Sequence, residues 1–314
     1  MRHLRSFLPL LAAIAFLLVI FAFWVPQRRF LTPGNLMDLA QQIAVNAILA
    51  FGLTLVILIG GIDLSVGAVV ALSGVVCVSV LGVAGPLGGL AAGLGAAILI
   101  GVANGLCAVR TRMPPFIITL ATMRVGRGIA LGFNESRPLP IDVTQTFILS
   151  LGNTRVGGWL PLPVVVMIAA FAVTAVLLHR TRFGQHLFAI GGNRQAARFT
   201  GIAIARHEVA VYAICGLCAG IAGMIHASQL YSAEPAAGQG FELNAIAAVV
   251  VGGTSFSGGI GTLPGALLGA IIIGILDKGL NQAGVHFSLQ YVVKGMVILA
   301  AVYTDVRRRT EAVS

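Results

Sequence analysis

Apolar runs long enough to cross a bilayer recur from one end of this chain to the other, separated by short charged segments. A transmembrane helix needs about 20 consecutive apolar residues, whereas a soluble domain carries about 25% charged residues. Only 10% of the 314 residues are charged here, and 58% are hydrophobic. The sequence therefore predicts an all-α polytopic membrane protein and excludes a soluble protein with a single anchor.

We expect about ten transmembrane helices within a single domain that spans 1–314. The first run is followed by bulky residues rather than a small-residue cleavage site, so it is expected to remain as a span. The eighth run is short and interrupted by glycine, which predicts a partial or bent span. The expected spans are 7–25, 36–59, 64–83, 87–109, 114–133, 162–179, 208–230, 242–257, 262–281 and 287–304.

The basic residues predict how the spans are oriented. Cytoplasmic loops carry an excess of Lys and Arg, so the net charge of +10 reflects topology rather than nucleic-acid binding. With both termini inside, the inner side holds Arg2, Arg5, Arg110, Arg112, Arg180, Arg182, Arg194, Arg198, Arg206, Arg307, Arg308 and Arg309, and the outer side holds Arg28, Arg29, Arg137 and Arg155. This bias predicts cytoplasmic termini, a cytoplasmic loop at 180–207 and an outer loop at 134–161.

The loop 180–207 is a long basic interruption of the apolar chain. Asn193 is a good helix N-cap, and Gly201 suits the left-handed position that follows a helix. These two residues predict one short helix of about two turns between them. A short capped helix on the cytoplasmic side indicates contact with a soluble partner. The alternative is that the arginines only set the orientation.

An internal repeat is predicted at an offset of 198 residues, with nine identities over 46–68. Asn46 leads to Gly60-Gly61, as Asn244 leads to Gly258-Gly259. Both units read as a span, a Gly-Gly break and a second span, and interrupted spans at matching positions point to a transport path. Because a polar side chain at membrane depth usually faces protein or a cavity, Asn46 and Asn244 are candidate path-lining residues.

Three acidic or hydroxyl-bearing residues can each serve either a structural role at a helix start or a role in the transport path. Asp63 and Ser65, after Gly60-Gly61, can cap the following helix or line an inner gate. Glu242 lies in a first helical turn, where the helix dipole favours an anion, but it can also face a hydrated entrance. Both readings stay open, and all three residues are candidates for a path or gate.

Other polar and small residues are expected to serve packing. Arg124 and Arg127, unusual within a span, are expected to snorkel or to pair with carbonyls, and Asp277-Lys278 to pair locally.

Five Gly-x3-Gly pairs allow close helix contact, mostly within one subunit and in one or two cases between subunits. The pairs begin at Gly89, Gly101, Gly128, Gly216 and Gly265.

Catalytic and cofactor motifs are missing from the sequence. No G-x4-G-K-[S/T] phosphate loop occurs, so the chain is not expected to hydrolyse ATP. No nucleophile–base or metal-ligand constellation occurs either, and intramembrane carboxylates are scarce, unlike in a proton-driven carrier. The sequence therefore predicts a protein that is not an enzyme and holds no metal or cofactor.

Four motifs, in order along the chain, resemble the ribose-type permease of bacterial ATP-binding-cassette (ABC) importers. They are Asn46-Ala-Ile-Leu-Ala-Phe-Gly-Leu-Thr to Gly60-Gly-Ile-Asp-Leu-Ser-Val-Gly67, Pro115-Phe-Ile-Ile-Thr-Leu-Ala-Thr-Met123, Ala189-Ile-Gly-Gly-Asn193 with Ala196-Ala197-Arg198 and Gly201, and Glu242-Leu-Asn-Ala-Ile-Ala to Val251-Gly-Gly-Thr254. The resemblance covers roughly 36–305 and implies a multi-pass subunit of the bacterial inner membrane.

The resemblance also implies the partners. A cytoplasmic ATPase would carry ATP and Mg, a periplasmic sugar-binding protein would deliver a pentose or hexose, and a second permease subunit, identical or closely homologous, would complete the path. The segment that matches the family's coupling helix would dock on the ATPase through Gly191, Gly192, Asn193, Arg194, Ala196, Ala197, Arg198 and Gly201.

We therefore expect the transmembrane subunit of an ATP-driven monosaccharide importer. Few strong polar groups occur in the spans, so sugar specificity is expected to rest mainly with the binding protein. The alternative is a secondary sugar carrier or facilitator that works alone.

Overall fold

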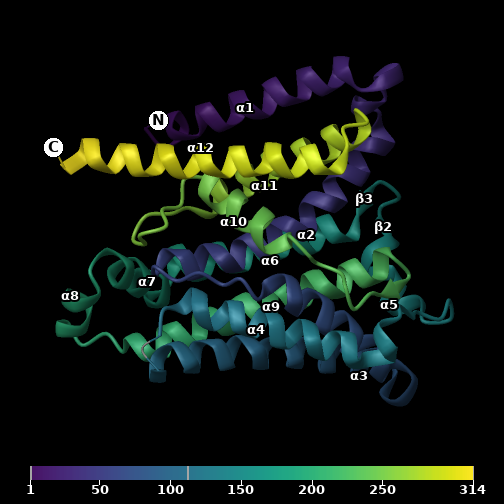
Figure 1. Cartoon of the computed structure of the whole chain (residues 1–314), viewed down its shortest axis with the longest axis horizontal. Coiled ribbons are helices and arrows are strands. Elements are labelled where there is room, and N and C mark those ends of the chain that lie inside the picture. Colours follow the sequence, from purple (N-terminus) through teal and green to yellow (C-terminus); the bar gives the residue numbers. More distant parts are fainter. Residues whose placement is uncertain (1, 112, 314) are drawn as a thin grey trace.

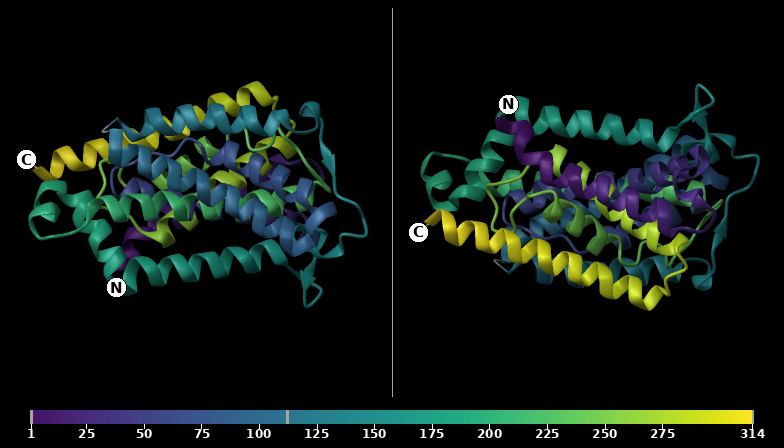
Figure 2. Two further views of the ribbon diagram at one scale, coloured as in Figure 1. Left: turned by 90° about the horizontal axis from the view of Figure 1, so that it is seen from below. Right: turned by 90° about the horizontal axis from the view of Figure 1, so that it is seen from above.

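The computed structural model describes residues 2–111 and 113–313, with side chains for 7–26, 29–111 and 113–303. Arg112 lies outside the described residues, as do the side chains of the arginines at 2, 5, 28 and 307–309 that enter the orientation argument. The chain forms a bundle of helices that run mostly along one direction (Figure 1). Figure 2 shows α6 along one flank of this bundle and α12 along the opposite flank.

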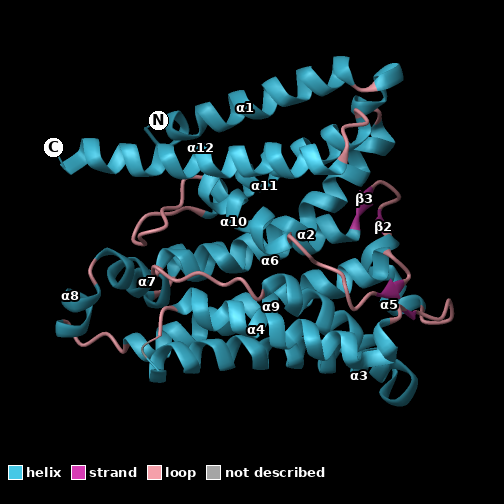
Figure 3. Cartoon of the chain, viewed as in Figure 1, coloured by secondary structure: helices cyan, strands magenta, loops and turns pink. Residues whose placement is uncertain are grey.

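Helices account for almost all of the regular structure (Figure 3). They are α1 (Arg2–Trp24), η1 (Pro26–Leu31), α2 (Pro33–Leu58), α3 (Val66–Thr111), α4 (Pro115–Gly132), η2 (Phe133–Ser136), α5 (Thr146–Asn153), α6 (Leu162–Arg180), α7 (Arg182–Gly192), α8 (Arg194–Phe199), α9 (Ile204–Gln229), α10 (Phe241–Val251), α11 (Leu263–Gln282) and α12 (Phe287–Val313). The strands are β1 (Leu139–Pro140), β2 (Arg155–Val156), β3 (Leu160–Pro161) and β4 (Ser232–Ala233).

The prediction of an all-α polytopic protein is confirmed. Helices α1, α2, α3, α4, α6, α9 and α11 are each long and apolar enough to cross a membrane, and α10 and the segment Phe287–Tyr303 of α12 add shorter apolar helices. The eighth predicted span corresponds to α10, whose 11 residues extend roughly 16 Å, about half of the hydrocarbon thickness. It is therefore a partial span, as the glycine-interrupted run indicated.

Two predicted spans, 64–83 and 87–109, form the two arms of α3. The helix breaks at Gly85, which has φ +69°, a conformation that favours glycine, and Pro86 begins the second arm. The arms pack closely, because a Cβ at Gly93 would lie 2.6 Å from the Ser73 carbonyl oxygen. The break is therefore a tight hairpin between two antiparallel spans.

Helix α2 lies at the centre of the bundle and packs against α6, α9, α10 and α11. All of its residues from 47 to 58 are buried. After α2 the chain turns at 59–60 and is non-helical over 61–65 before α3 begins at Val66, and a second non-helical segment over 234–240 precedes α10. The second segment lies against the first turn of α3, since a Cβ at Gly67 would overlap the Gly238 carbonyl oxygen.

The two predicted repeat units share the order helix, glycine break, helix. Their first helices differ in length, because α2 has 26 residues and α10 has 11. The breaks meet each other, with the Gly259 N–H donating to the Leu58 carbonyl oxygen at 2.8 Å. Gly191 of α7 lies against both breaks, so a Cβ there would overlap the Leu58 oxygen and the Gly259 nitrogen. We call Gly60, Gly191, Gly258 and Gly259 the glycine junction.

Four of the five Gly-x3-Gly pairs serve packing within this chain, as predicted for most of them. A Cβ at one glycine of each pair would approach a backbone oxygen of another span too closely, namely Gly93 with Ser73, Gly101 with Tyr212, Gly216 with Ala97 and Gly269 with Ala248. The pair Gly128 and Gly132 on α4 differs, because a Cβ at either would meet nothing within 4 Å. That pair is free to contact something outside the chain.

The end of the bundle opposite α7 and α8 carries α5 and the strands (Figure 3). Strand β1 pairs antiparallel with β4, with Leu139 opposite Ala233, and β2 pairs with β3 in a short hairpin. This end corresponds to the predicted outer loop 134–161. Both chain termini lie at the other end, together with α7 and α8 (Figure 1).

Candidate functional site

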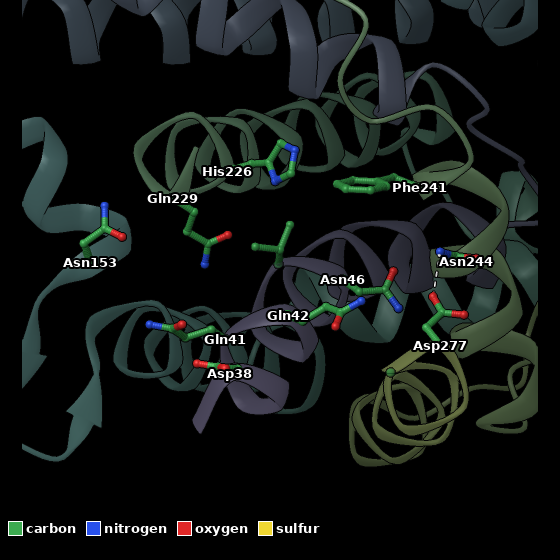
Figure 4. A pocket seen from close by; sticks show the side chains of 12 residues that line it. Asp38, Gln41, Gln42, Asn46, Asn153, His226, Gln229, Phe241, Asn244 and Asp277 are labelled. Atoms are coloured by element: carbon green, nitrogen blue, oxygen red, sulfur yellow. Dashed lines mark hydrogen bonds between the residues drawn. The ribbon is translucent and has the colours of Figure 1, made fainter. Parts of the chain in front are cut away.

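A cavity of about 470 Å³ opens among α2, α9, α10 and α11. Its position near the last residue of α5 places it toward the end that carries the strands. Figure 4 shows His226, Gln229 and Phe241 on one side of the cavity and Gln42 and Asn46 on the opposite side. The complete lining is Asp38, Gln41, Gln42, Val45, Asn46, Asn153, His226, Gln229, Phe241, Asn244, Gly274 and Asp277.

Carboxamide side chains dominate the polar lining of this cavity. Six of its residues are Asn or Gln, and each amide offers both hydrogen-bond donors and acceptors. Phe241 supplies an aromatic surface, and its ring lies edge-on to His226 with the centroids 5.3 Å apart. Such a surface suits a small, neutral ligand that has both hydroxyl groups and apolar C–H groups.

The two carboxylates of the cavity are paired with lysines from elsewhere. The Asp277 carboxylate lies 2.9 Å from Lys294 Nζ on α12, and it also accepts a hydrogen bond from Asn244 Nδ2 at 3.3 Å. Asp38 lies 3.9 Å from Lys278 Nζ. The predicted local pair Asp277-Lys278 is therefore wrong, because successive residues of a helix point in different directions and each finds its partner on another helix.

The structure brings the repeat-matched residues Asn46 and Asn244 to the same cavity, from α2 and α10. Glu242 does not line it. Its carboxylate accepts from the Gly240 N–H at 3.2 Å, which matches the helix-start reading of this residue. Arg127 donates to the carbonyl oxygens of Pro235 and Ala237, so the expected pairing with carbonyls is confirmed and the segment before α10 is held in place.

Asp63 and Ser65 also lie away from the cavity. Both are 1% exposed, and Asp63 Oδ1 accepts from the Ser65 N–H at 2.8 Å and from its hydroxyl at 2.6 Å. Asn104 Nδ2 donates to the Ser65 oxygen at 3.0 Å, and Thr119 bonds the backbone of 62–64. These bonds fix the non-helical segment before α3, but none of them joins the Asp63 or Ser65 side chain to an N–H of the first turn of α3. Whether the two residues cap the helix or line a gate therefore stays a prediction.

The loop 180–207 contains two helices, α7 and α8, so the prediction of a single short helix is wrong. The predicted part is present as α8, where Asn193 Oδ1 accepts from the Ala196 N–H at 2.9 Å and Gly201 has φ +83°. The helix α7 was missed. Leu187 and Ile190, at positions i and i+3, are buried on its inner face. This apolar spacing was the available signal for a helix.

The expected coupling residues divide into an inward and an outward group. Gly191 belongs to the last turn of α7, and it packs against Leu58 and Gly259 within the glycine junction. Ala197 is 3% exposed and turns into the bundle, whereas Gly191 is half-buried. The remaining coupling residues Gly192, Asn193, Arg194, Ala196, Arg198 and Gly201 are exposed. Phe199, which the sequence reading did not single out, is 89% exposed at the end of α8.

One ion pair fastens α8 to the start of α9. Arg194 bonds Glu208, whose side chain is 8% exposed, while the arginine side chain is 53% exposed. The pair borders a second hollow of about 430 Å³, which is also lined by Arg198 and by residues 113–115. The loop is therefore a fixed structure that displays α8 at one tip of the molecule (Figure 1).

Most of the cavity residues were missed at the sequence level, although a signal exists. Asp38, Gln42 and Asn46 recur every four residues and so share one face of α2. The partners from α9 and α11 become visible only in the fold. Within the residues that the structure describes, no group of three or more His, Cys, Asp or Glu side chains is suited to a metal ion.

Comparison with known proteins identifies the family. The family described as branched-chain amino acid transport system / permease component matches residues 35–302. The chain is 45% identical over 278 residues to the ribose import permease protein RbsC of Bacillus subtilis (strain 168), covering 88% of this chain and 86% of that protein. It is 41% identical over 290 residues to RbsC of Escherichia coli (strain K12), covering 90% and 88%.

More distant relatives in Escherichia coli (strain K12) include the L-arabinose transport system permease protein AraH, at 34% identity over 299 residues, covering 94% of this chain and 89% of that protein. No solved structure gives a significant match. The length of the family match and these identities show that the chain is a transport subunit rather than an enzyme. The chain belongs to the branched-chain amino acid transport system / permease component family, the membrane-spanning subunits of ABC importers.

Proposed function

We propose that this chain is the transmembrane subunit of an ABC importer for a monosaccharide, a pentose or hexose of the ribose type. The observation that carries the proposal is its 45% identity to a ribose import permease over nearly its whole length. The amide-lined cavity supports it, because a neutral polyol both donates and accepts hydrogen bonds. The missing phosphate loop means that ATP is hydrolysed on a separate subunit.

Transport by reconstituted components tests this function. Proteoliposomes that contain the chain with its cognate ATPase should accumulate radiolabelled D-ribose, D-allose or L-arabinose only when ATP is inside and the sugar-binding protein is outside. Accumulation or equilibration of these sugars by the chain alone would contradict the proposal and favour a stand-alone carrier. Failure to transport any of the three sugars with all components present would also count against it.

The orientation in the bacterial inner membrane is part of the proposal. Both termini lie at the end of the bundle that carries α7 and α8, and the strands lie at the opposite end (Figure 1). The arginine distribution then favours a cytoplasmic location for both termini and for the loop 180–207, and a periplasmic one for 134–161. In this orientation the cavity opens toward the periplasm, where a binding protein releases sugar.

ATPase and binding-protein partners follow from the family, and we propose α8 as the ATPase contact. Arg198 places positive charge on the proposed cytoplasmic tip, beside the exposed Phe199 ring, while the exposed Arg194 pairs with Glu208. Arginine and aromatic side chains are enriched among the residues that dominate protein interfaces. Motion of the ATPase would reach the spans through α7, whose Gly191 touches both helix breaks.

A second permease subunit is proposed to cover α4. Leu120, Arg124, Gly128 and Gly132 recur every four residues and form an exposed stripe along this span. Arg124 lies at the middle of α4 and forms no hydrogen bond or ion pair with the described residues. Because a charged side chain at that depth faces protein or water rather than lipid, we propose that the stripe meets a second copy across a shared interface.

Cysteine cross-linking checks this interface. Gly128→Cys, in a background where the exposed Cys107 is replaced by serine, should form a disulfide-linked dimer in oxidised membranes, because Gly128 has open space around it. Val173→Cys on α6, at a 67% exposed position, is the matched control and should stay monomeric. Cross-linking of the control without cross-linking at position 128 would contradict the α4 interface.

A further inference from the structure

We propose that the cavity among α2, α9, α10 and α11 is a weak monosaccharide-binding site within this chain, occupied during passage from the binding protein to the cytoplasm. This inference rests on the proposed function and goes beyond it. The low number of strong polar groups in the spans suggested that specificity rests mainly with the binding protein. The cavity adds a second point at which the sugar is recognised.

The size and depth of the cavity fit a small ligand. A volume of about 470 Å³ falls within the range of ligand pockets, roughly 300–1,000 Å³. Asn46 lies thirteen residues into α2, about 20 Å along the helix axis from Pro33. The cavity therefore extends well into the bundle from the proposed periplasmic end.

Two amides of the lining have unused hydrogen-bonding capacity. Across the described ranges, neither the Gln42 nor the Asn46 side chain forms a hydrogen bond to another protein group, although Asn46 is only partly exposed. A polar group away from bulk water needs a partner, which applies to the half-buried Asn46, whereas Gln42 is exposed. A sugar hydroxyl can supply both a donor and an acceptor to each amide, so these two residues are the first candidates for direct contact.

The carboxylate of Asp277, on α11, is a further hydrogen-bond acceptor in the lining of the cavity. Lys294 and Asn244 hold it by contacts of 2.9 and 3.3 Å, and an ionised carboxylate can accept about four hydrogen bonds. Its side chain is 14% exposed, so part of it still reaches the cavity. Because Lys294 balances its charge, the site favours a neutral polyol over a cation.

An aromatic wall completes the match to a sugar. Phe241, in the first turn of α10, and His226, in α9, meet edge to face, and both line the cavity. Sugars carry apolar C–H faces between their hydroxyl groups, and an aromatic ring removes such a face from water. The amides on α2 lie across the cavity from these rings (Figure 4), so the ligand would be held between a polar and an aromatic wall.

The arrangement predicts weak binding. A transport site must release its cargo, so it has to be favourable enough to admit the sugar and weak enough to let it leave. A few neutral hydrogen bonds in an open cavity correspond to a dissociation constant on the order of 1 mM. This value is compatible with tight capture by the separate binding protein.

The test uses the assembled permease–ATPase complex in nanodiscs, without binding protein. Saturation-transfer NMR with D-ribose, D-allose and L-arabinose should detect binding of at least one sugar at millimolar concentration. Gln42→Leu and Asn46→Leu should each weaken that signal about tenfold or more and should raise the sugar concentration needed for half-maximal uptake. Asn281→Ala, which removes an exposed amide outside the cavity, should behave as the wild type.

Different outcomes of these measurements would contradict the sugar site and the importer function. Should the wild-type complex import a sugar while both leucine variants keep its uptake kinetics and NMR signal, the cavity site is wrong and the importer function stands. Absence of sugar import by the wild type with all its partners would instead contradict the importer function. Gln42 is exposed, so its variant keeps the test valid even if Asn46→Leu fails to insert.

Discussion

Replacing Gly191 with valine should abolish sugar uptake. A Cβ at this position would overlap the Leu58 carbonyl oxygen and the backbone nitrogen of Gly259, and neither backbone atom can rotate away as a flexible side chain would. It would also disturb the 2.8 Å hydrogen bond from the Gly259 N–H to that oxygen. Overpacking of this kind costs about 1–3 kcal/mol or more, which corresponds to a loss on the order of 10- to 100-fold in a coupled equilibrium.

Uptake and ATPase assembly should be measured on the same Gly191→Val membranes. Because α8 is not altered, the ATPase should still co-purify and hydrolyse ATP, while transport is lost. Gly95→Val is the matched control, since a Cβ at Gly95 meets nothing within 4 Å. A well-inserted Gly191→Val complex with near-normal uptake would show that the glycine junction does not transmit motion to the spans.

The helical spans were predictable because a chain in lipid must satisfy its backbone hydrogen bonds within each segment. This requirement makes the length of an apolar run a direct indication of a helix, as the ten expected spans show. The local chemistry of Asn193 and Gly201 was equally readable. Helix α7 was missed although Leu187 and Ile190 are spaced as on one helix face, because it ends in two glycines, which usually mark a break.

Only part of the cavity lining could be predicted from the sequence. The repeat pointed to Asn46 and Asn244, and the structure places both residues on one cavity. Asp277 could not be assigned, because its partner Lys294 belongs to another helix. Asp63 had two valid interpretations, a cap or a gate, and the bond from Asn104 to Ser65 shows only that this pair is held inside the bundle, so both interpretations stay predictions. Side-chain roles set by contacts between distant helices need the fold.

The second large effect is expected at Phe199. Truncation to alanine should weaken ATPase binding by about 30-fold or more, because an aromatic residue that dominates an interface contributes at least about 2 kcal/mol. The ring is 89% exposed, so its removal leaves no cavity in the bundle and should not affect membrane insertion. The measurement is the affinity of the purified ATPase for the permease in nanodiscs, with Phe199→Leu expected to retain part of the binding.

The matched control for this variant is Trp159→Ala. It removes an aromatic ring that is 64% exposed in the loop 134–161, at the opposite end of the bundle from α8. On the proposed topology this loop is periplasmic, so ATPase affinity should remain at the wild-type value. Equal affinities for Phe199→Ala and the wild type would exclude the ring as the anchor and leave Arg194 and Arg198 as the ATPase contacts of α8. A loss in Trp159→Ala that matches the loss in Phe199→Ala would contradict the assignment of α8 to the cytoplasmic side, because two rings at opposite ends of the spans cannot both meet one soluble partner.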